Sequence, residues 1–461
     1  MIGAASATPR TAILYRMIWR WHFYAGLFCI PFVLWLAVTG SIYLFKPQVE
    51  ALIDRPYDNL TVGERTAPSA QVQAALAALP GGTLQSLELP ETSNAATRVI
   101  VKDHGVPTRV YIHPGTLQVL KVVPEDDRLE NVVFKLHGEL LMGDTGSIIV
   151  ELAASWAIVM IVTGLYLWWP RRTTGLAGIV YPRLSAGSRT FWRDLHAVTG
   201  FWVSFFTLFI LLSGLPWAKS WGAYLQEIRA VTGTAVAKQD WPSGSPAKKD
   251  GAAMAMDDMA GMPGMAMPEQ GASQPLDLAA LDRVVASAIP LKLAPPVLIS
   301  PPETADGPWS AKSDAQNRIL RGDVTLDGET GQVLSRVDFG QRQLVDRIVG
   351  VGVAAHEGHL FGWLNQLISL LTALGLMTVC ISALVMWWRR RPVGVLGAPP
   401  PMPGSTAAAA IIGLIIVFAV LLPLLGATLI LLLAVESLVL KKIPTARIWL
   451  GLGAIRRRSG V

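Results

Sequence analysis

The chain has 461 residues, of which 52% are hydrophobic and only 16% are charged. Soluble chains carry ~25% charged residues, so this composition indicates a membrane protein rather than a soluble enzyme or binding domain. The formal net charge is +6, but no nucleic-acid-binding motif accompanies it. We therefore attribute the excess of Lys and Arg to membrane topology and expect no nucleic-acid partner.

Apolar runs of about 20 residues, long enough to cross ~30 Å of hydrocarbon, predict the membrane spans. Four such runs lie at 22–45, 147–169, 196–217 and 363–388. A fifth stretch, 407–440, is interrupted at Pro423 and is too long for one simple span. It predicts a hairpin of two short helices, which makes about six spans in total.

Basic residues predict the orientation of these spans. Lys and Arg residues are concentrated in four segments. These are the N-terminal part that precedes the first span, with Arg10, Arg16 and Arg20, the loop 170–195, the linker 389–406 and the tail 441–461. All four segments lie on the cytoplasmic side if both termini are cytoplasmic. The first apolar run has no small-residue cleavage site and so does not read as a signal peptide. We expect an inner-membrane protein with two large periplasmic segments, 46–146 and 218–362.

A strand, tight turn and second strand are predicted in each periplasmic segment. Residues 110–120 and 324–334 alternate in polarity around a Gly-containing turn, and they align without a gap. Alternation with a glycine turn is typical of a β-hairpin.

The spans themselves form an internal repeat. Two glycines follow His22 at +4 and +18, and two glycines follow His196 at the same offsets. His137 and His356 are each followed by Gly at +6 and by Trp-Trp at +31 and +32. Two units of the same orientation predict a tandem duplication about a pseudo-two-fold axis along the membrane normal.

The repeat pairs the histidines at the span ends. His22 becomes equivalent to His196 on the cytoplasmic side, and His137 to His356 on the periplasmic side. Two imidazoles facing each other across an axis suit the trans axial positions of haem iron, so we predict two haems, one per leaflet. His359 stands one helical turn beyond His356 and is an alternative outer ligand, although the repeat register favours His356.

A different interpretation of these histidines stays open. Histidine is tolerated at a membrane interface because its polar tip reaches the headgroups, and a duplicated gene inherits matched histidines whatever their role. His104 and His113 have no repeat partners and are interpreted as surface residues. No flavin or nicotinamide fingerprint occurs in the sequence, so the electrons must come from another protein or from quinol.

The distance along the second span requires a break in the helix. His137 and Trp169 are 32 residues apart, which is ~48 Å of continuous helix and exceeds the hydrocarbon core. We expect the break at Gly143, Asp144 and Gly146, with His137 on a short separate helix.

Small and aromatic residues complete the expected packing. Gly26, Gly164, Gly200 and Gly214 are expected to allow close approach of a neighbouring helix or of a flat macrocycle. The Trp168-Trp169 and Trp387-Trp388 pairs read as cytoplasmic interface anchors. Cys29 and Cys380 lie inside spans and read as buried apolar side chains.

A methionine-rich insert, 239–275, distinguishes the second periplasmic segment. It is rich in Gly, Ala, Pro and Ser without periodicity, which predicts a loop. Thioethers are soft ligands that suit Cu(I), so the insert is either a copper site or a plain linker. The candidate ligands are Met254, Met256, Met259, Met262, Met265 and Met267.

Several of these motifs resemble one known family. They are Trp21-His22-Phe23-Tyr24-Ala25-Gly26-Leu27, Leu136-His137-Gly138-Glu139-Leu140 and Asp194-Leu195-His196-Ala197-Val198-Thr199-Gly200. They closely resemble the PepSY-associated transmembrane proteins, a group often labelled iron-regulated membrane proteins that includes ferrisiderophore reductases. The resemblance covers residues from about 14 to 392.

The resemblance implies an α-helical polytopic membrane protein with two α+β periplasmic PepSY-like lobes. It implies a bacterial inner-membrane reductase that carries electrons outward through b-type haem to a periplasmic ferric chelate. The methionine-rich insert departs from this pattern and leaves the metal substrate open. Two alternatives remain, a non-enzymatic module whose PepSY-like lobes bind a peptide or protein, and a copper-handling protein. The resemblance does not specify the electron donor, the identity of the acceptor or the oligomeric state.

Overall fold

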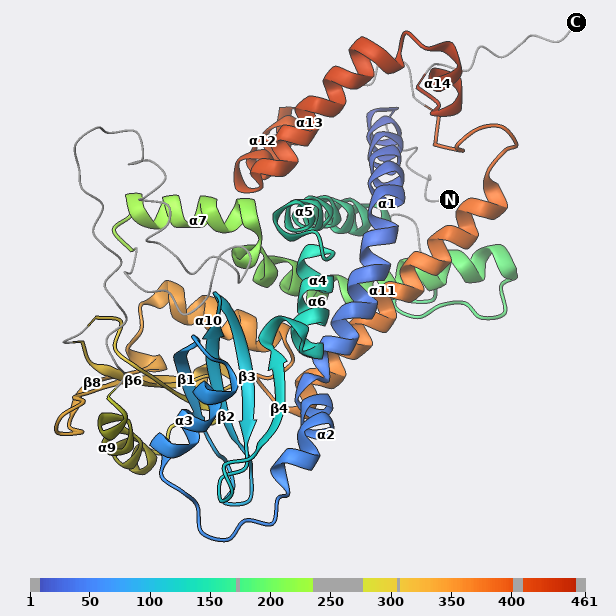
Figure 1. The fold of residues 1–461 in the computed structure, drawn as a ribbon. Coiled ribbons are helices and arrows are strands. Elements are labelled where there is room, and N and C mark those ends of the chain that lie inside the picture. Colours follow the sequence, from blue (N-terminus) through green and yellow to red (C-terminus); the bar gives the residue numbers. More distant parts are fainter. Residues whose placement is uncertain (1–8, 171–174, 235–276, 305–306, 401–408, 453–461) are drawn as a thin grey trace, which may run out of the picture. The chain divides into compact units, whose positions relative to one another are not determined.

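The structure is a computed structural model that describes residues 9–170, 175–234, 277–304, 307–400 and 409–452 (Figure 1). The chain divides into two compact units, which we describe separately. The helical unit comprises Met1–Ile42, Leu136–Ala235 and Leu367–Val461. The sheet unit comprises Tyr43–Lys135 and Val236–Gln366.

Within the described residues, five helices are long and apolar enough to cross a membrane. They are formed by α1 (Pro9–Leu44), α5 (Gly143–Trp168), α6 (Ser188–Gly214) with the turn η2 (Leu215–Trp217), α11 (Trp363–Arg390), and α13 (Pro423–Val435) with the π-helix η6 (Glu436–Leu440). The first four overlap the four predicted single spans, although the first and third begin earlier than predicted. The segment 407–440, which was predicted to be a hairpin, contains α13 and a shorter apolar helix, α12 (Ala409–Leu421). Pro423 is the first residue of α13 and lies at the junction of the two helices.

The C-terminal helices pack against the other helices of the helical unit. Ile158, Leu215, Leu422 and Leu425 form a buried apolar cluster of α5, η2 and the start of α13. The Trp156 indole of α5 donates a hydrogen bond to the Thr428 hydroxyl at 3.3 Å. Further along, Arg20 of α1 donates to the Gly451 carbonyl, which follows α14 (Pro444–Trp449), at 3.2 Å. These contacts fix the C-terminal helices to both α1 and α5.

The second span is interrupted just before the predicted break, so that Gly143, Asp144 and Gly146 lie in the first turn of α5. His137 lies in α4 (Leu129–Glu139), and α5 begins at Gly143. Between them Leu140, Leu141 and Gly143 have φ of 52°, 57° and 58°, in the left-handed region that ends helices. Gly146 then lies against the end of α4, because a Cβ on it would be 1.6 Å from the Glu139 carbonyl oxygen.

The sheet unit contains one antiparallel sheet of eight strands, in the order β4-β3-β2-β1-β5-β6-β7-β8. The first segment supplies β1 (Thr83–Leu89), β2 (Thr97–Asp103), β3 (Val106–Ile112) and β4 (Val119–Pro124). The second supplies β5 (Val297–Ser300), β6 (Trp309–Ser313), β7 (Gly322–Leu326) and β8 (Val333–Asp338). Both predicted hairpins are confirmed, as β3–β4 and β7–β8.

The two outer segments share this sheet, although the sequence predicts two lobes. Strands β1 and β5 pair antiparallel, with Leu87 opposite Ile299 and Leu89 opposite Val297. Each lobe alone would leave the backbone groups of this edge strand unpaired, and the pairing satisfies them. The predicted lobes are therefore the two halves of one sheet.

Helices α3 (Pro68–Ala78) and α9 (Leu278–Ala288) pack on one face of the sheet (Figure 1). Val72 of α3 and Leu281 of α9 are fully buried against Val99, Ile299 and other inward-facing strand residues. Burial of a Val or Leu side chain contributes roughly 1.5–3 kcal/mol, so this layer forms the core of the sheet unit.

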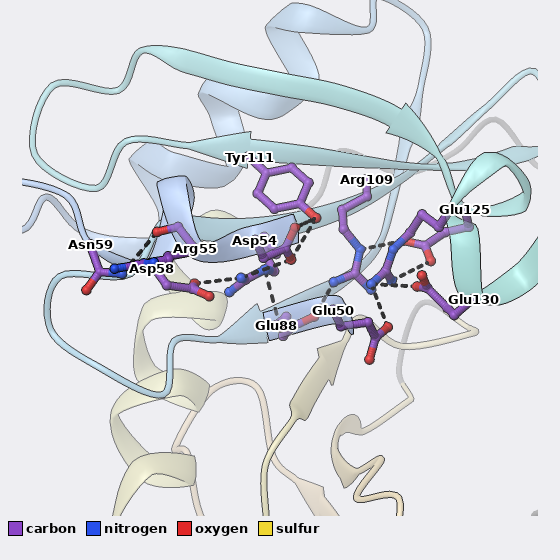
Figure 2. A network of polar contacts seen from close by, with 12 residues as sticks. Glu50, Asp54, Arg55, Asp58, Asn59, Glu88, Arg109, Tyr111, Glu125 and Glu130 are labelled. Carbon is purple, nitrogen blue, oxygen red and sulfur yellow. Dashed lines mark hydrogen bonds and ion pairs between the residues drawn. The ribbon is translucent and has the colours of Figure 1, made fainter. Parts of the chain in front are cut away.

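The face of the sheet opposite α3 and α9 carries charged side chains. Glu88, Arg98 and Tyr111 are direct neighbours across β1, β2 and β3. Helix α2 (Lys46–Asp58) presents two carboxylates to this row: Arg98 pairs with Asp54 at 3.2 Å and with Asp58 at 2.6 Å (Figure 2). The Tyr111 hydroxyl donates to Asp54 at 3.1 Å. A buried ion pair is costly unless further hydrogen bonds satisfy its polar atoms, and the Tyr111 hydroxyl supplies one to Asp54.

The network continues to the start of α4. Arg109 joins Glu88 and Glu125, each at 2.6 Å. Arg128 in turn joins Glu125, Glu50 and Glu130, at 3.2, 3.1 and 2.6 Å. Six carboxylates thus meet three guanidinium groups, which leaves excess negative charge; the carboxylates are Glu50, Asp54, Asp58, Glu88, Glu125 and Glu130.

Burial, with the neighbouring carboxylate of Glu130, favours a bound proton at Glu50. Burial raises the pKa of the Glu50 carboxyl to about 7, Lys46 and Arg128 oppose the rise, and Glu130 adds to it. The unfolded chain releases this proton near its ordinary pKa of 4.5, whereas the folded chain holds it up to about 7. Stability from this group is therefore present at low pH and is lost as the pH rises through that window.

Glu50→Gln should remove this dependence on pH. We expect the wild-type protein to lose about 1–2 kcal/mol of stability between pH 5 and pH 8 that the variant retains. The measurement is the thermal midpoint of the full-length protein in detergent across that range. Glu64→Gln, at an exposed carboxylate, is the matched control. Parallel pH profiles for wild type and Glu50→Gln would contradict the expectation.

Gly146→Ala should disrupt the junction of α4 and α5, because its Cβ would overlap the Glu139 carbonyl. We expect a loss of about 3 kcal/mol or more in thermal unfolding. Gly138→Ala is the matched control: nothing lies within 4 Å of its added Cβ, and alanine in a helix is favoured by about 0.5–1 kcal/mol over glycine. Equal midpoints for the two variants would refute this account of the junction.

Candidate functional site

His22 of α1 and His196 of α6 lie together in the helical unit. Their ring centres are 6.4 Å apart, with an angle of 78° between the ring planes. Both side chains are partly buried. The structure therefore brings together the two histidines that the repeat pairs on the predicted cytoplasmic side.

The hydrogen bonds of His22 fix which ring nitrogen carries the proton. Its Nδ1 is 3.1 Å from the Met160 carbonyl oxygen and 3.2 Å from the Thr163 hydroxyl, both in α5. A carbonyl can only accept, so Nδ1 carries the hydrogen and donates it. The Nε2 lone pair of His22 is then available for a ligand.

His196 has the same arrangement with α11. Its Nδ1 donates to the Val379 carbonyl at 3.0 Å, and the Ser382 hydroxyl is 3.4 Å away. The Ser382 hydroxyl gives its own proton to Val379, as Thr163 gives its proton to Val159. His196 therefore also offers its Nε2 lone pair.

Two imidazoles in this state fit a metal with two trans axial positions. An imidazole nitrogen binds a first-row metal at ~2.0–2.1 Å, so two trans ligands place their nitrogens about 4 Å apart and their ring centres further apart. The observed separation of 6.4 Å agrees with that geometry. Metal-bound histidines also donate their other ring N–H to a carbonyl or carboxylate, as both rings do here.

Glycines allow helices to approach these rings closely. A Cβ on Gly164 would be 3.0 Å from Cε1 of His22. Gly26 and Gly200 face Met160 and Val379, at the ordinary contact distances of 3.8 and 3.9 Å. Of these three glycines, Gly164 is the one whose missing side chain makes room for a histidine ring.

His137 also lies beside a hydroxyl group of a neighbouring helix. Its Nδ1 is 3.0 Å from the Thr39 hydroxyl of α1, and this hydroxyl gives its own proton to the Trp35 carbonyl at 2.9 Å. A Cβ on Gly40 would be 3.0 Å from Cε1 of His137. Thr39 is 17 residues beyond His22 in the same helix, so the two sites lie about 25 Å apart along α1.

His356 and His359 belong to the sheet unit. His356 is the last residue of α10 (Leu344–His356), and the His359 backbone N–H donates to the Ala354 carbonyl at 2.7 Å. Burial lowers the pKa of His359 to about 4, and the charge of Lys46 adds to this effect. The ring is therefore neutral at physiological pH, and the pairing of His137 with His356 or with His359 stays a prediction.

The other two histidines have ordinary roles. The His104 side chain is 85% exposed and lies 2.7 Å from Asp103. His113 is partly buried, and its Nδ1 accepts hydrogen bonds from the backbone of Gly115 and Thr116 in the turn after β3. His104 is a surface residue as predicted, whereas His113 stabilises the turn.

The methionine-rich insert and its six candidate copper ligands lie outside the described residues. Among the residues that the structure does describe, no group of three or more His, Cys, Asp or Glu side chains could hold a metal ion. Cys29 and Cys380 are buried and free, in agreement with their prediction as small apolar side chains.

The sequence missed the hydroxyl groups beside the histidines. Thr163 follows His137 by 26 residues, and Ser382 follows His356 by the same number. This equal offset could have identified them before the structure.

One member of each Trp pair makes a contact that the sequence did not predict. Trp168 and Trp387 donate hydrogen bonds to the loop carbonyls of Ile179 and Leu396, at 3.0 and 2.8 Å. They hold the loops that follow their helices. Their neighbours Trp169 and Trp388 are 65% and 70% exposed, which suits the predicted role.

Comparison with known proteins identifies the family. Residues 19–390 match the family model described as the PepSY-associated TM region, which is most of the chain. A comparison with curated proteins found no match. With five apolar helices of spanning length among its described residues, the chain is a membrane protein, and it belongs to the family of the PepSY-associated transmembrane region.

Proposed function

We propose that the protein is a haem-containing reductase of the bacterial inner membrane that moves electrons outward to a periplasmic ferric chelate. The observation that carries this proposal is the pair His22 and His196. Their ring centres are 6.4 Å apart, and each donates its Nδ1 hydrogen to a backbone carbonyl. Metal-bound histidines usually donate their other ring N–H to a carbonyl, a carboxylate or water, and both of these histidines donate to a carbonyl.

The histidines would be divided between two haem sites. His22 and His196 would hold one b-type haem, and His137 would hold a second with His356, or with His359 as the alternative. Bound haem would supply one-electron redox chemistry at each site. The carbonyls of Met160 and Val379 would keep the first pair of rings in the ligand tautomer, and the Thr39 hydroxyl would do so for His137.

A tandem duplication explains why the first two ligands match. Among the described residues, both halves run through the same order of elements: a long helix, a short helix, a helix, four strands, a helix and a long helix. In the first half these are α1, α2, α3, β1–β4, α4 and α5; in the second they are α6, α7 (Lys219–Val231), α9, β5–β8, α10 and α11. The order supports a pseudo-two-fold axis along the membrane normal, with His22 and His196 as equivalent ligands.

The membrane topology and the balance of electrons complete the proposal. The basic segments beside the spans support a topology with both termini in the cytoplasm and residues 46–146 and 218–362 in the periplasm. Each electron delivered converts one Fe(III) of a chelate to Fe(II), and an equal number must enter from an unidentified donor on the cytoplasmic side. The ferric chelate as acceptor rests on the family resemblance.

One observation favours a second candidate function, a non-enzymatic module that binds a peptide. Strand β8 is an edge of the sheet, and Val333, Leu334 and Val337 on it are 46%, 59% and 42% exposed. An exposed edge strand can accept an added strand from a partner. A protein that binds no haem but protects β8 from hydrogen exchange when a peptide is added would favour this function.

His22→Ala should abolish one haem and leave the fold intact. We expect the purified wild-type protein to show bis-imidazole bands in its reduced-minus-oxidised spectrum. The variant should lose about half of their intensity, because one of two sites loses an axial ligand. His104→Ala, at an exposed histidine, is the control and should match wild type. A colourless wild-type protein, expressed with ample haem, would rule out the proposal.

Gly164→Ala should disturb the same site without removing a ligand. Its Cβ would press on Cε1 of His22 at 3.0 Å, so the ring must move by a few tenths of an ångström. We expect lower haem occupancy, or altered low-spin bands, at unchanged expression. Gly26→Ala, whose Cβ meets Met160 at 3.8 Å, is the matched control. If both variants give the wild-type spectrum, Gly164 does not position His22.

A further inference from the structure

Nδ1 of His22 faces two acceptors of α5. The Met160 carbonyl oxygen is 3.1 Å away and the Thr163 hydroxyl oxygen is 3.2 Å away, so the single Nδ1 hydrogen is shared between them. The hydroxyl can accept because it gives its own proton to the Val159 carbonyl, at 2.8 Å. One acceptor alone would let the ring swing about the hydrogen bond, whereas two acceptors fix the direction of the N–H and limit the rotation of the ring.

His196 meets the same pair of groups in α11. The Val379 carbonyl oxygen is 3.0 Å from its Nδ1, and the Ser382 hydroxyl oxygen is 3.4 Å away. Ser382 is fully buried, and its hydroxyl gives its own proton to the Val379 carbonyl at 2.9 Å. In α5 and in α11 the hydroxyl comes three residues after the carbonyl. The two rings are therefore oriented in the same way by two different helices.

The two rings are nearly perpendicular, with 78° between their planes and 6.4 Å between their centres. An iron bound by both Nε2 atoms lies in the plane of each ring, so in a bis-imidazole haem this angle is the angle between the two ligand planes. Each imidazole raises the energy of the iron d-orbital that its π-orbital overlaps. Perpendicular rings raise two different d-orbitals and leave them almost equal in energy, whereas parallel rings raise one of them and separate the pair.

The energies of these two d-orbitals affect both the redox behaviour and the spectrum of the iron. Low-spin ferric iron lacks one electron in them, and a separated pair stabilises it because the missing electron comes from the raised orbital. Ferrous iron, in which both are filled, gains nothing. Perpendicular rings therefore remove a stabilisation of ferric iron, so the iron accepts an electron more readily. They also leave orbital angular momentum in the ferric state, which makes its electron paramagnetic resonance signal strongly anisotropic instead of rhombic.

We propose that Thr163 and Ser382 are positioning residues that keep the rings of His22 and His196 nearly perpendicular on a bound haem, and that this angle raises its reduction potential. The inference rests on the proposed haem function and adds the residues that tune this site. Each hydroxyl acts through the Nδ1 atom of its histidine. A raised potential makes the site a better acceptor for electrons that enter from the cytoplasmic donor.

Electron paramagnetic resonance of the ferric full-length protein in detergent, together with redox titration of its haem bands, tests the inference. We expect a strongly anisotropic low-spin signal that His196→Gly removes, which assigns the signal to this site. Thr163→Val removes the hydroxyl and keeps the side-chain volume, so the signal should shift toward the rhombic form and the potential should fall. Thr163→Ser keeps the hydroxyl and should restore both wild-type values.

Thr207→Val is the matched control. The Thr207 hydroxyl also donates to the carbonyl four residues earlier, at 2.8 Å, but it lies 11 residues beyond His196 in α6. The signal and the potential should therefore stay at their wild-type values. Ser382→Ala removes the second hydroxyl and gives the same readout if Thr163→Val binds no haem.

A rhombic signal from this site in the wild-type protein would overturn the inference, and so would an anisotropic signal that neither Thr163→Val nor Ser382→Ala shifts. Both results leave the haem function standing, because the bis-imidazole bands persist. A wild-type protein without those bands would overturn the haem function and this inference together.

Discussion

The hydrogen bonds from Nδ1 of His22 and His196 to carbonyls of the facing helices are the interactions on which the candidate site depends. They join α1 to α5 and α6 to α11, and in each case they determine which nitrogen remains free. Leaving a buried imidazole N–H without an acceptor would cost ~1–3 kcal/mol, so the rings are held in one tautomer. Gly164 lets α5 approach His22 closely enough for this bond.

A second constraint determines where His137 lies. A continuous helix from His137 through the second span would be too long for the hydrocarbon core, and the left-handed residues Leu140 and Leu141 end α4 before it. The Trp35 indole donates to the Leu136 carbonyl at 3.0 Å, so α1 holds the end of this short helix. The same helix α1 thus contacts both candidate sites, and its length separates them.

Local patterns in the sequence predicted the spans, the two hairpins and the break before α5, because each depends on neighbouring residues. They did not predict the pairing of β1 with β5, since Leu87 and Ile299 are far apart in the sequence and either strand could have been an edge. The polar face under α2 was missed for a similar reason: Arg98 and Asp54 meet only when helix and sheet pack. The histidines were found from the repeat, but their acceptors include backbone carbonyls, which no side-chain motif reveals.

The most direct test of the central claim is the electron paramagnetic resonance spectrum of the ferric full-length protein, with and without added imidazole. The account predicts low-spin signals from bis-imidazole iron in the wild-type protein. In His22→Gly one of these signals should disappear, and free imidazole, which fits the space left by the ring, should restore it. A low-spin signal that the substitution does not change would show that His22 is not a ligand and would contradict the account.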